Sequence, residues 1–311
     1  MTFLNYLVHF LFYPGLVFAF IVGWFFYWLF RKVRARMQYR RGPPWFQPFA
    51  DIVKLLSKSS IVPKTARRKL FVWLSVILFI SISVTLMFIP AGPSSAPIAF
   101  YGDLIALLYL LLIPSLVFVA CGPSSSSPFG SVGSNREAVL MLAYESAFTI
   151  AIISIAFTAG SLSLSTIVSQ QSGFSWLIFR NPFAAVAIFL CLVGKLHLKP
   201  FDIPEAEQEI VAGTVTEYSG KFLGLIEISR TLLWYIAGVL FADLFLGGGD
   251  GFPMPWCVIN LLIKASIVVF ALTIVNVASA RYRIDQAFTW YLKIPIPLSL
   301  IGLTLAIVSG G

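Results

Sequence analysis

The segment PFDIPEAEQEIVAGTVTEYSGK, residues 200–221, lies between two long apolar runs and decides how the chain can fold. It carries five carboxylates, and a sixth, Glu227, follows just inside the next apolar run. The chain has 13 acidic residues among 311, so nearly half of them lie in less than a tenth of its length. Because burying charge is costly, an apolar chain gathers acid only where the acid is used. We therefore expect the chemistry in this acidic loop, which carries Asp202, Glu205, Glu207, Glu209 and Glu217.

The overall composition is that of a membrane protein. Hydrophobic residues make up 59% of the chain and charged residues 11%, against roughly 45–50% and about 25% in globular domains. Apolar runs of about twenty residues are long enough to cross a bilayer. The sequence thus predicts an all-α polytopic membrane protein, one integral membrane domain over residues 1–311 with about eight transmembrane helices. We expect the spans at about 3–30, 70–90, 103–120, 137–159, 182–198, 222–246, 258–279 and 287–308.

The formal net charge of +9 reflects topology rather than nucleic-acid binding. Nineteen lysines and arginines lie in or beside alternate loops, and the intervening loops hold only Arg180. Basic loops face the cytoplasm by the positive-inside rule. We therefore expect both termini outside, in the plasma membrane of a prokaryote, and no nucleic-acid partner. The expected cytoplasmic loops are residues 31–69, 121–136, 199–221 and 280–286.

The chain lacks the residue clusters that hold metals. Its three cysteines form no CxxC pair, and His9 and His197 stand alone. Iron–sulfur clusters need about four thiolates, and metal sites need clustered ligands. We expect no metal and no redox centre in this chain, so that electrons, if any, travel through other subunits.

Two segments outside the spans have a local pattern. Residues 45–58 place Phe49, Ile52, Val53 and Leu56 on one face, which predicts an amphipathic helix. That helix could lie in the headgroup plane or form the wall of a lateral opening, and the two are compatible. Residues 121–136 are rich in Ser, Gly and Pro and are expected to be a loop, ending where Ser134 or Asn135 caps the fourth span.

Charged residues also fall within the spans. Glu145, Asp243 and Lys264 interrupt apolar runs, and Glu227 lies one turn before Arg230, with which it can pair. A charge at bilayer depth costs at least about 2.5–3.5 kcal/mol, so these groups should face each other or water. Two interpretations stay open: ion pairs that lock helices together, or a hydrated chain of groups that exchange protons.

Several motifs resemble the complex I subunit 1 family. The segments 200–209 and 217–220 are similar to the signature of that family, and Lys264 and residues 281–285 fall where the family has them. Residues 34–36, 40–43, 51–56, 127–129 and 136–138 are similar to its hydrogenase-type branch, found in membrane-bound [NiFe]-hydrogenase, formate hydrogenlyase and related complexes.

This resemblance implies a subunit that docks a peripheral arm and couples it to ion movement. It implies cytoplasmic iron–sulfur and hydrogenase-like partners, antiporter-like and small membrane subunits, and iron–sulfur clusters with a possible Ni-Fe centre in those partners. The resemblance implies proton-pathway roles for Glu145, Asp202, Glu205, Glu207, Glu209, Glu217 and Lys264. We add Tyr218, Glu227, Arg230, Asp243 and Asp285 as further proton-pathway candidates. The implied docking or cavity residues are Arg34, Arg36, Arg40, Arg41, Asp51, Lys54, Arg136, Lys195, Arg281 and Arg283.

One departure from the family pattern bears on the function. Lys195 stands seven residues before Asp202, where family members commonly carry a glutamate. A base in place of an acid argues against a strict copy of the family's proton path and against quinone reduction.

The function expected is that of a membrane-anchor and energy-coupling subunit of a complex-I-like respiratory oxidoreductase, hydrogenase or sulfur-reducing in type. It would link electron transfer in a peripheral arm to proton or sodium translocation. One alternative is the quinone-site subunit of an NADH:quinone oxidoreductase. A further alternative is a stand-alone secondary transporter, although the sequence shows no internal repeat of the kind common in such folds.

Overall fold

The computed structural model describes residues 9–92, 96–171, 173, 175–249 and 252–310, apart from the side chains of Glu207 and Ser309. Helices make up 74% of the residues that the structure describes, and these residues include no strand. Seven helical stretches in the described part are long and apolar enough to cross a membrane, and α9 is a shorter apolar helix. The predicted all-α polytopic class is therefore confirmed. The exact limits of the spans stay a prediction, and residues 3–8 of the first expected span lie outside the described residues.

The long helices follow the apolar runs of the sequence. They are α2 (Leu16–Met37), α4 (Arg68–Thr85), α5 (Asp103–Ser125), α6 (Pro128–Ala159), α9 (Pro182–Lys195), α11 (Gly220–Phe245), α12 (Trp256–Ala278), α13 (Ile284–Lys293) and α14 (Pro295–Gly310). The short ones are α3 (Gln47–Ser57), α7 (Leu164–Ser169), α8 (Leu177–Arg180), α10 (Glu207–Ile210) and the 3-10 turns η1 (Leu86–Phe88) and η2 (Gly213–Val215).

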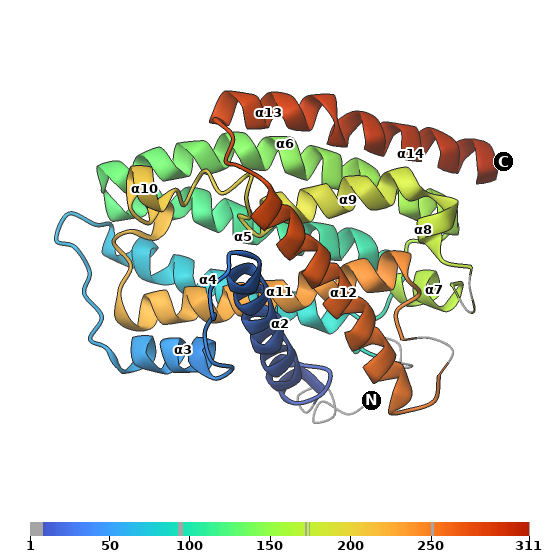
Figure 1. The fold of residues 1–311 in the computed structure, drawn as a ribbon, viewed down its shortest axis with the longest axis horizontal. Helices are drawn as coiled ribbons and strands as arrows, with labels where there is room; N and C mark the ends of the chain where they lie inside the picture. The colour runs from blue at the N-terminus through green and yellow to red at the C-terminus, as the bar shows by residue number, and fades with distance from the viewer. Residues whose placement is uncertain (1–8, 93–95, 172, 174, 250–251, 311) are drawn as a thin grey trace.

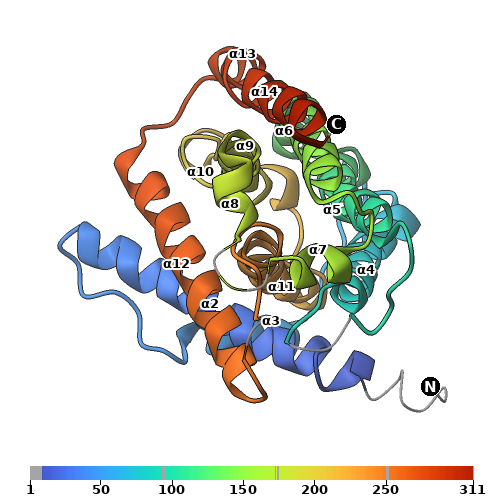
Figure 2. The ribbon, with the colours of Figure 1, turned by 90° about the vertical axis from the view of Figure 1, so that its right-hand side faces the viewer.

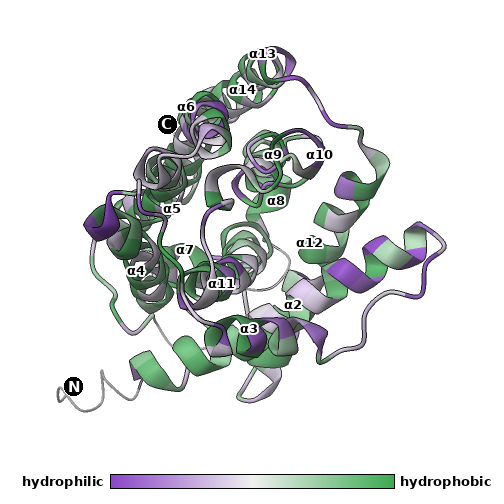
Figure 3. Cartoon of the chain, turned by 90° about the vertical axis from the view of Figure 1, so that its left-hand side faces the viewer, coloured by the Kyte–Doolittle hydropathy of each residue, from purple (hydrophilic) through white to green (hydrophobic). Residues whose placement is uncertain are grey.

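Helix α11 runs through the middle of the bundle (Figure 2). It packs against α2, α3, α4 and α12, while α6 packs against α5, α9, α13 and α14. Helix α10 lies at one end of the bundle, and α7, α8 and the C-terminus lie at the other (Figure 1). Hydrophilic residues gather on the loops at the α10 end, whereas the helices are mostly hydrophobic (Figure 3). The charged chemistry is thus concentrated at one end of an apolar bundle.

The expected amphipathic helix is present as α3. Its Ile52 is buried, whereas Phe49 and Val53 remain exposed. The helix packs along α11, and an ion pair of 2.9 Å between Arg31 and Asp51 ties it to α2. Helix α3 therefore forms a wall against the bundle with a second apolar face still open to its surroundings.

The Ser- and Gly-rich segment 121–136 is not the loop that its composition predicts. Helix α5 continues to Ser125 and α6 begins at Pro128, so only two residues lie between them. The small residues let these helices approach closely, since a Cβ placed on Gly122 would lie 2.1 Å from the carbonyl oxygen of Gly130. The predicted cap is also wrong, because Ser134 lies inside α6 and its hydroxyl accepts from the Gly122 backbone N–H at 3.0 Å.

The acidic loop is an ordered turn pinned at several points. Its helix α10 is a single turn that begins at Glu207. Gly213 has a φ of +54°, and a Cβ there would lie 1.8 Å from the Pro204 carbonyl oxygen. This close approach folds the loop back on itself and holds its carboxylates beside α6, which contacts both α10 and η2.

Candidate functional site

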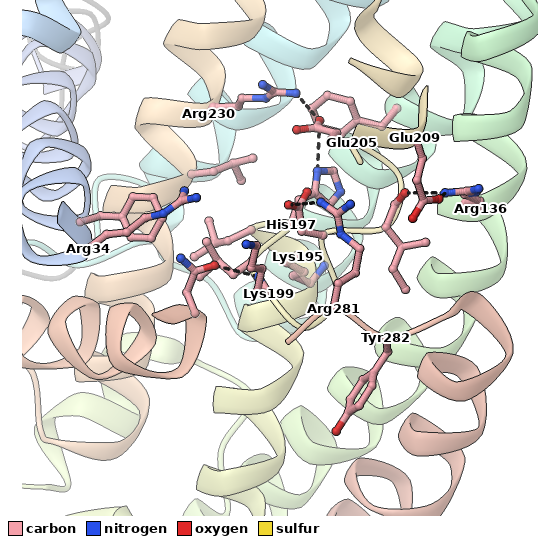
Figure 4. A pocket seen from close by; sticks show the side chains of 18 of the residues that line it. Arg34, Arg136, Lys195, His197, Lys199, Glu205, Glu209, Arg230, Arg281 and Tyr282 are labelled. Carbon is pink, nitrogen blue, oxygen red and sulfur yellow. Dashed lines mark hydrogen bonds and ion pairs between the residues drawn. The ribbon is translucent and has the colours of Figure 1, made fainter. Parts of the chain in front are cut away.

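A polar cavity of about 1000 Å³ opens at the α10 end of the bundle (Figure 4). Its walls come from α2, α6, α9, the acidic loop, α11 and the turn between α12 and α13. The cavity therefore brings together segments that are far apart in the sequence. Its charged and titratable lining residues are Arg34, Arg136, Lys195, His197, Lys199, Asp202, Glu205, Glu209, Arg230, Arg281 and Arg283.

Three carboxylates of the acidic loop are each bound by an arginine from another element. Asp202 pairs with Arg281 at 2.9 Å. Glu209 pairs with Arg136 of α6 at 2.6 Å. Glu205 pairs with Arg230 of α11. These pairs fix the loop over the bundle and bring residues from four separate segments together at one place.

Arg230 also holds the carboxylate that precedes it by one turn. Its guanidinium is 2.8 Å from Glu227, so the predicted pair exists. One arginine thus bridges two carboxylates, one on its own helix and one on the acidic loop.

His197 is the residue that links the loop to the bundle. Its Nδ1 lies 3.3 Å from Oε1 of Glu205, and its Nε2 lies 3.2 Å from Oε2 of Glu137. The backbone reverses at this residue, which has a φ of +49°, directly after α9 ends. A left-handed conformation is uncommon for a residue with a side chain. The turn aims the imidazole between two carboxylates, and Glu137 is fully buried.

The electrostatics of this junction favour charged groups. Burial by itself opposes protonation of His197, but the charges of Glu137 and Glu205 outweigh it and raise the imidazole pKa to about 10. Burial likewise opposes ionisation of Glu205, and the charges of Arg230 and His197 outweigh it and lower that pKa to about 2. Asp202 behaves differently, since burial raises its pKa even with Arg281 beside it.

A continuous line of polar contacts leads from this junction into the apolar bundle. The Tyr144 hydroxyl donates to Oε1 of Glu137 at 2.8 Å and lies 2.9 Å from Ser115 Oγ. The Ser115 hydroxyl in turn donates to Glu145 Oε1 at 3.2 Å. We call the series Glu205, His197, Glu137, Tyr144, Ser115 and Glu145 the polar chain.

Lys195 gives the polar chain a second connection to the cavity. Its ammonium pairs with Glu145, and it also donates to the Leu111 carbonyl oxygen at 3.1 Å. The same ammonium lies 4.8 Å from the centre of the Phe148 ring. Because Lys195 also lines the cavity, Glu145 is reached both through His197 and through Lys195.

The polar chain is chemically suited to moving protons. Carboxylates, an imidazole, a phenol and an ammonium can each take up or release a proton within hydrogen-bonding reach of the next group. Its members are mostly buried, so they exchange protons with each other and not with bulk water. The described residues contain no group of three or more His, Cys, Asp or Glu that could hold a metal ion.

Other predicted site residues lie away from the polar chain. Lys264 donates to the carbonyl oxygens of Leu246 and Gly248 at 2.6 and 2.8 Å, where α11 ends at the opposite end of the bundle. Asp243 is buried near the same end of α11. Tyr218 stacks on Phe71, with ring centres 4.0 Å apart. Lys264 thus caps the end of α11.

The remaining predicted residues lie at or near the surface of the α10 end. Glu217 is partly buried, and Asp285 and Arg283 are mostly exposed and 3.9 Å apart. The side chain of Glu207 lies outside the described residues. Exposed to the surroundings are Arg36, Arg40, Arg41 and Lys54.

Four members of the polar chain were not predicted as site residues. His197 stood alone in the sequence, and Glu137 appeared only within residues 136–138, one of the segments that resemble the family. Tyr144 and Ser115 carried no signal of their own. One signal was available, because Glu137, Tyr144 and Glu145 have the i, i+7, i+8 spacing of a single helix face.

Known proteins and solved structures are similar to this chain over most of its length. A family model described as NADH dehydrogenase matches residues 11–307. One subunit of the F420H2 dehydrogenase of Methanosarcina mazei is 32% identical over 309 residues, covering 91% of this chain and 87% of that protein. A chain in the structure of a membrane-bound sulfane sulfur reductase, an archaeal respiratory membrane complex, is 32% identical with a TM-score of 0.88, covering 98% of this chain and 99% of that one. The chain therefore belongs to the NADH dehydrogenase family, the complex I subunit 1 family that its acidic loop resembles.

Proposed function

We propose that this chain is the membrane-embedded coupling subunit of a complex-I-like respiratory oxidoreductase. Electron transfer takes place in a soluble module docked over the cavity, and the polar chain carries the resulting proton movement into the bundle. Two relatives support this role, since one is named as part of a dehydrogenase and the other belongs to a respiratory membrane complex. The partners include iron–sulfur and hydrogenase-like subunits on the cytoplasmic side and antiporter-like membrane subunits beside the bundle.

The observation that carries the proposal is the unbroken polar chain from the cavity to Glu145. A structural ion pair between two helices needs only two groups, whereas here six residues from α5, α6, the turn after α9 and the acidic loop make consecutive contacts. Burying so many polar groups is costly, so their continuity indicates use.

The coupling follows from the charges around the cavity. A negative charge that arrives in the docked module shifts the balance among the ion pairs of Glu205 and Asp202, because electrostatic effects are strong where water is excluded. His197 already carries a proton on each ring nitrogen, so a proton taken up at the loop enters its Glu205 side only as its other ring nitrogen releases one to Glu137. From Glu137 it continues through Tyr144 and Ser115 to Glu145, and Lys195 holds the countercharge there. Glu145 then transfers the proton to neighbouring membrane subunits, or its change of charge acts on them electrostatically.

The direct genetic test replaces Glu145 with glutamine in the intact complex. Glu145→Gln keeps the shape of the side chain but removes a group that exchanges protons. We expect ion translocation per electron to fall by about 10²-fold, the contribution typical of a positioned acid–base group, while electron transfer in the module continues. Ser146→Ala, on the exposed side of the same helix, is the matched control. Unchanged translocation in Glu145→Gln counts against the coupling role.

A second candidate function, quinone reduction, has one observation in its favour. An apolar groove of about 450 Å³ lies between α2, α12 and the start of α3, lined by Trp24, Trp28, Trp45 and Leu262 among others. Such a groove suits an apolar tail entering from the bilayer. Reduction of added quinone by the intact complex, slowed when Ser266→Trp fills the groove, supports this candidate, and absence of quinone reduction removes it.

A further inference from the structure

The cavity holds more positive charge than its own carboxylates neutralise. Its lining acids, Asp202, Glu205 and Glu209, are each already paired with an arginine. Two cations of the lining also form ion pairs with carboxylates outside the lining: Lys195 with Glu145, and Arg230 with Glu227. Some cations of the lining take part in none of these ion pairs.

Arg34 and Lys199 are two such cations inside the cavity. Both line it and both are partly buried (Figure 4). Neither makes an ion pair with a carboxylate in the part of the chain that the structure describes. A partly buried cation has lost part of its hydration, and a nearby anion offsets that free-energy cost best.

The two cations are held on different, well-fixed elements. Arg34 is in the last turn of α2. Lys199 opens the acidic loop, and its backbone N–H donates to Asn276 Oδ1 at 2.9 Å. They therefore present two positive charges from two walls of one cavity, and this arrangement favours a partner that carries more than one negative group.

We propose that an acidic segment of a partner subunit enters this cavity and places its carboxylates on Arg34 and Lys199. This inference rests on the proposed function, in which a soluble module covers the cavity mouth. The size of the cavity favours a segment of chain, because about 1000 Å³ is the upper range of pockets that hold whole organic ligands. A small inorganic anion would leave most of that space to water.

The experiment uses zero-length cross-linking of the intact complex with a carbodiimide, which joins a lysine amine to a carboxylate in direct contact. We expect a cross-link between Lys199 and an aspartate or glutamate of a peripheral subunit, identified by mass spectrometry. Lys58, an exposed lysine of the same end that lies outside the cavity lining, is the internal comparison. An intact complex in which Lys199 gives no cross-link to a partner carboxylate contradicts the proposal.

A second measurement asks whether the pairing contributes to assembly. The double variant Arg34→Gln with Lys199→Gln should bind the peripheral module about tenfold more weakly at moderate salt, since close charge pairs across interfaces contribute strongly. The control double variant Arg68→Gln with Lys58→Gln should change binding little, because both residues are exposed, lie outside the cavity lining and are not among the expected docking residues.

The outcomes separate the inference from the function on which it rests. Unchanged binding of the module by the cavity variant, together with sulfate bound by the wild-type chain in its place, shows a small-anion site and overturns the inference alone. A wild-type chain that purifies without any peripheral subunit overturns both.

Discussion

At the residue scale, the site depends on side chains whose role is set by their position in space. The acidic loop, Glu145 and the Glu227–Arg230 pair could be predicted from the sequence, because acid is conspicuous in an apolar chain. The role of His197 could not be predicted, since it depends on a left-handed turn that places the imidazole between Glu137 and Glu205. No spacing pattern in the sequence indicates that residues 137, 197 and 205 lie in contact. The partner of Glu145 was likewise hidden, because Lys195 reaches it from another helix.

The charge of His197 makes a testable contribution to stability. Its pKa is about 10 in the folded chain against 6.5 for the free group. A group whose pKa is raised on folding stabilises the fold fully below its unfolded pKa, and that contribution is lost as the pH rises through its folded pKa. His197→Gln should therefore lower the melting temperature of the complex most near pH 6.5 and progressively less toward pH 10. His9→Gln, which changes the other histidine of the chain, is the control. An equal loss at both ends of this range contradicts the assigned charge.

At the element scale, the sequence predicts long helices well and their ends poorly. Serine, glycine and proline ordinarily mark loops, and this made residues 121–136 look like one. In the bundle the same residues serve close packing between α5, α6 and η2, for a Cβ on Gly133 would lie 2.8 Å from the Thr214 backbone nitrogen. Composition alone cannot separate these two uses of small residues, because the difference lies in the neighbouring helix. The amphipathic helix α3, with a clear 3.6-residue period, was predictable.

The close packing of α5 on α6 predicts the effect of one added methyl group. Gly122→Ala places a Cβ where only 2.1 Å separates it from the Gly130 carbonyl oxygen, so backbone must move. We expect a loss of about 1–3 kcal/mol, the usual effect of overpacking, seen as a lower melting temperature of the purified complex. Ser131→Ala, a change on the partly exposed side of α6, should leave the melting temperature nearly unchanged. Equal melting temperatures for both variants would contradict the close contact between α5 at Gly122 and α6 at Gly130.

At the scale of the whole molecule, polar groups are segregated. The cavity, the acidic loop and most basic residues lie at the α10 end (Figure 3), whereas the α7 and α8 end carries only a few charged residues, among them Arg180, Asp243 and Lys264. The alternation of basic loops in the sequence predicts this asymmetry, and by the positive-inside rule it also predicts that the α10 end faces the cytoplasm. A stand-alone transporter would instead place its binding site near the middle of the bundle.

This orientation can be measured by labelling introduced cysteines with a reagent that does not cross membranes. The native Cys121, Cys191 and Cys257 are all buried, so background labelling should be low. In right-side-out vesicles we expect Gln170→Cys to be labelled directly and Lys58→Cys only after the membrane is opened. Both positions are exposed, so a reversed result places the cavity outside and contradicts the docking of a cytoplasmic module.

The central claim is that groups of the polar chain change their protonation when the docked module is reduced. Infrared difference spectroscopy of the whole complex, recorded between its oxidised and reduced forms, observes this change directly as carboxyl bands that appear or disappear. We expect such a band in the wild type, shifted in heavy water and missing from Glu145→Gln. A difference spectrum without any carboxyl change, or one identical in the two proteins, would contradict it.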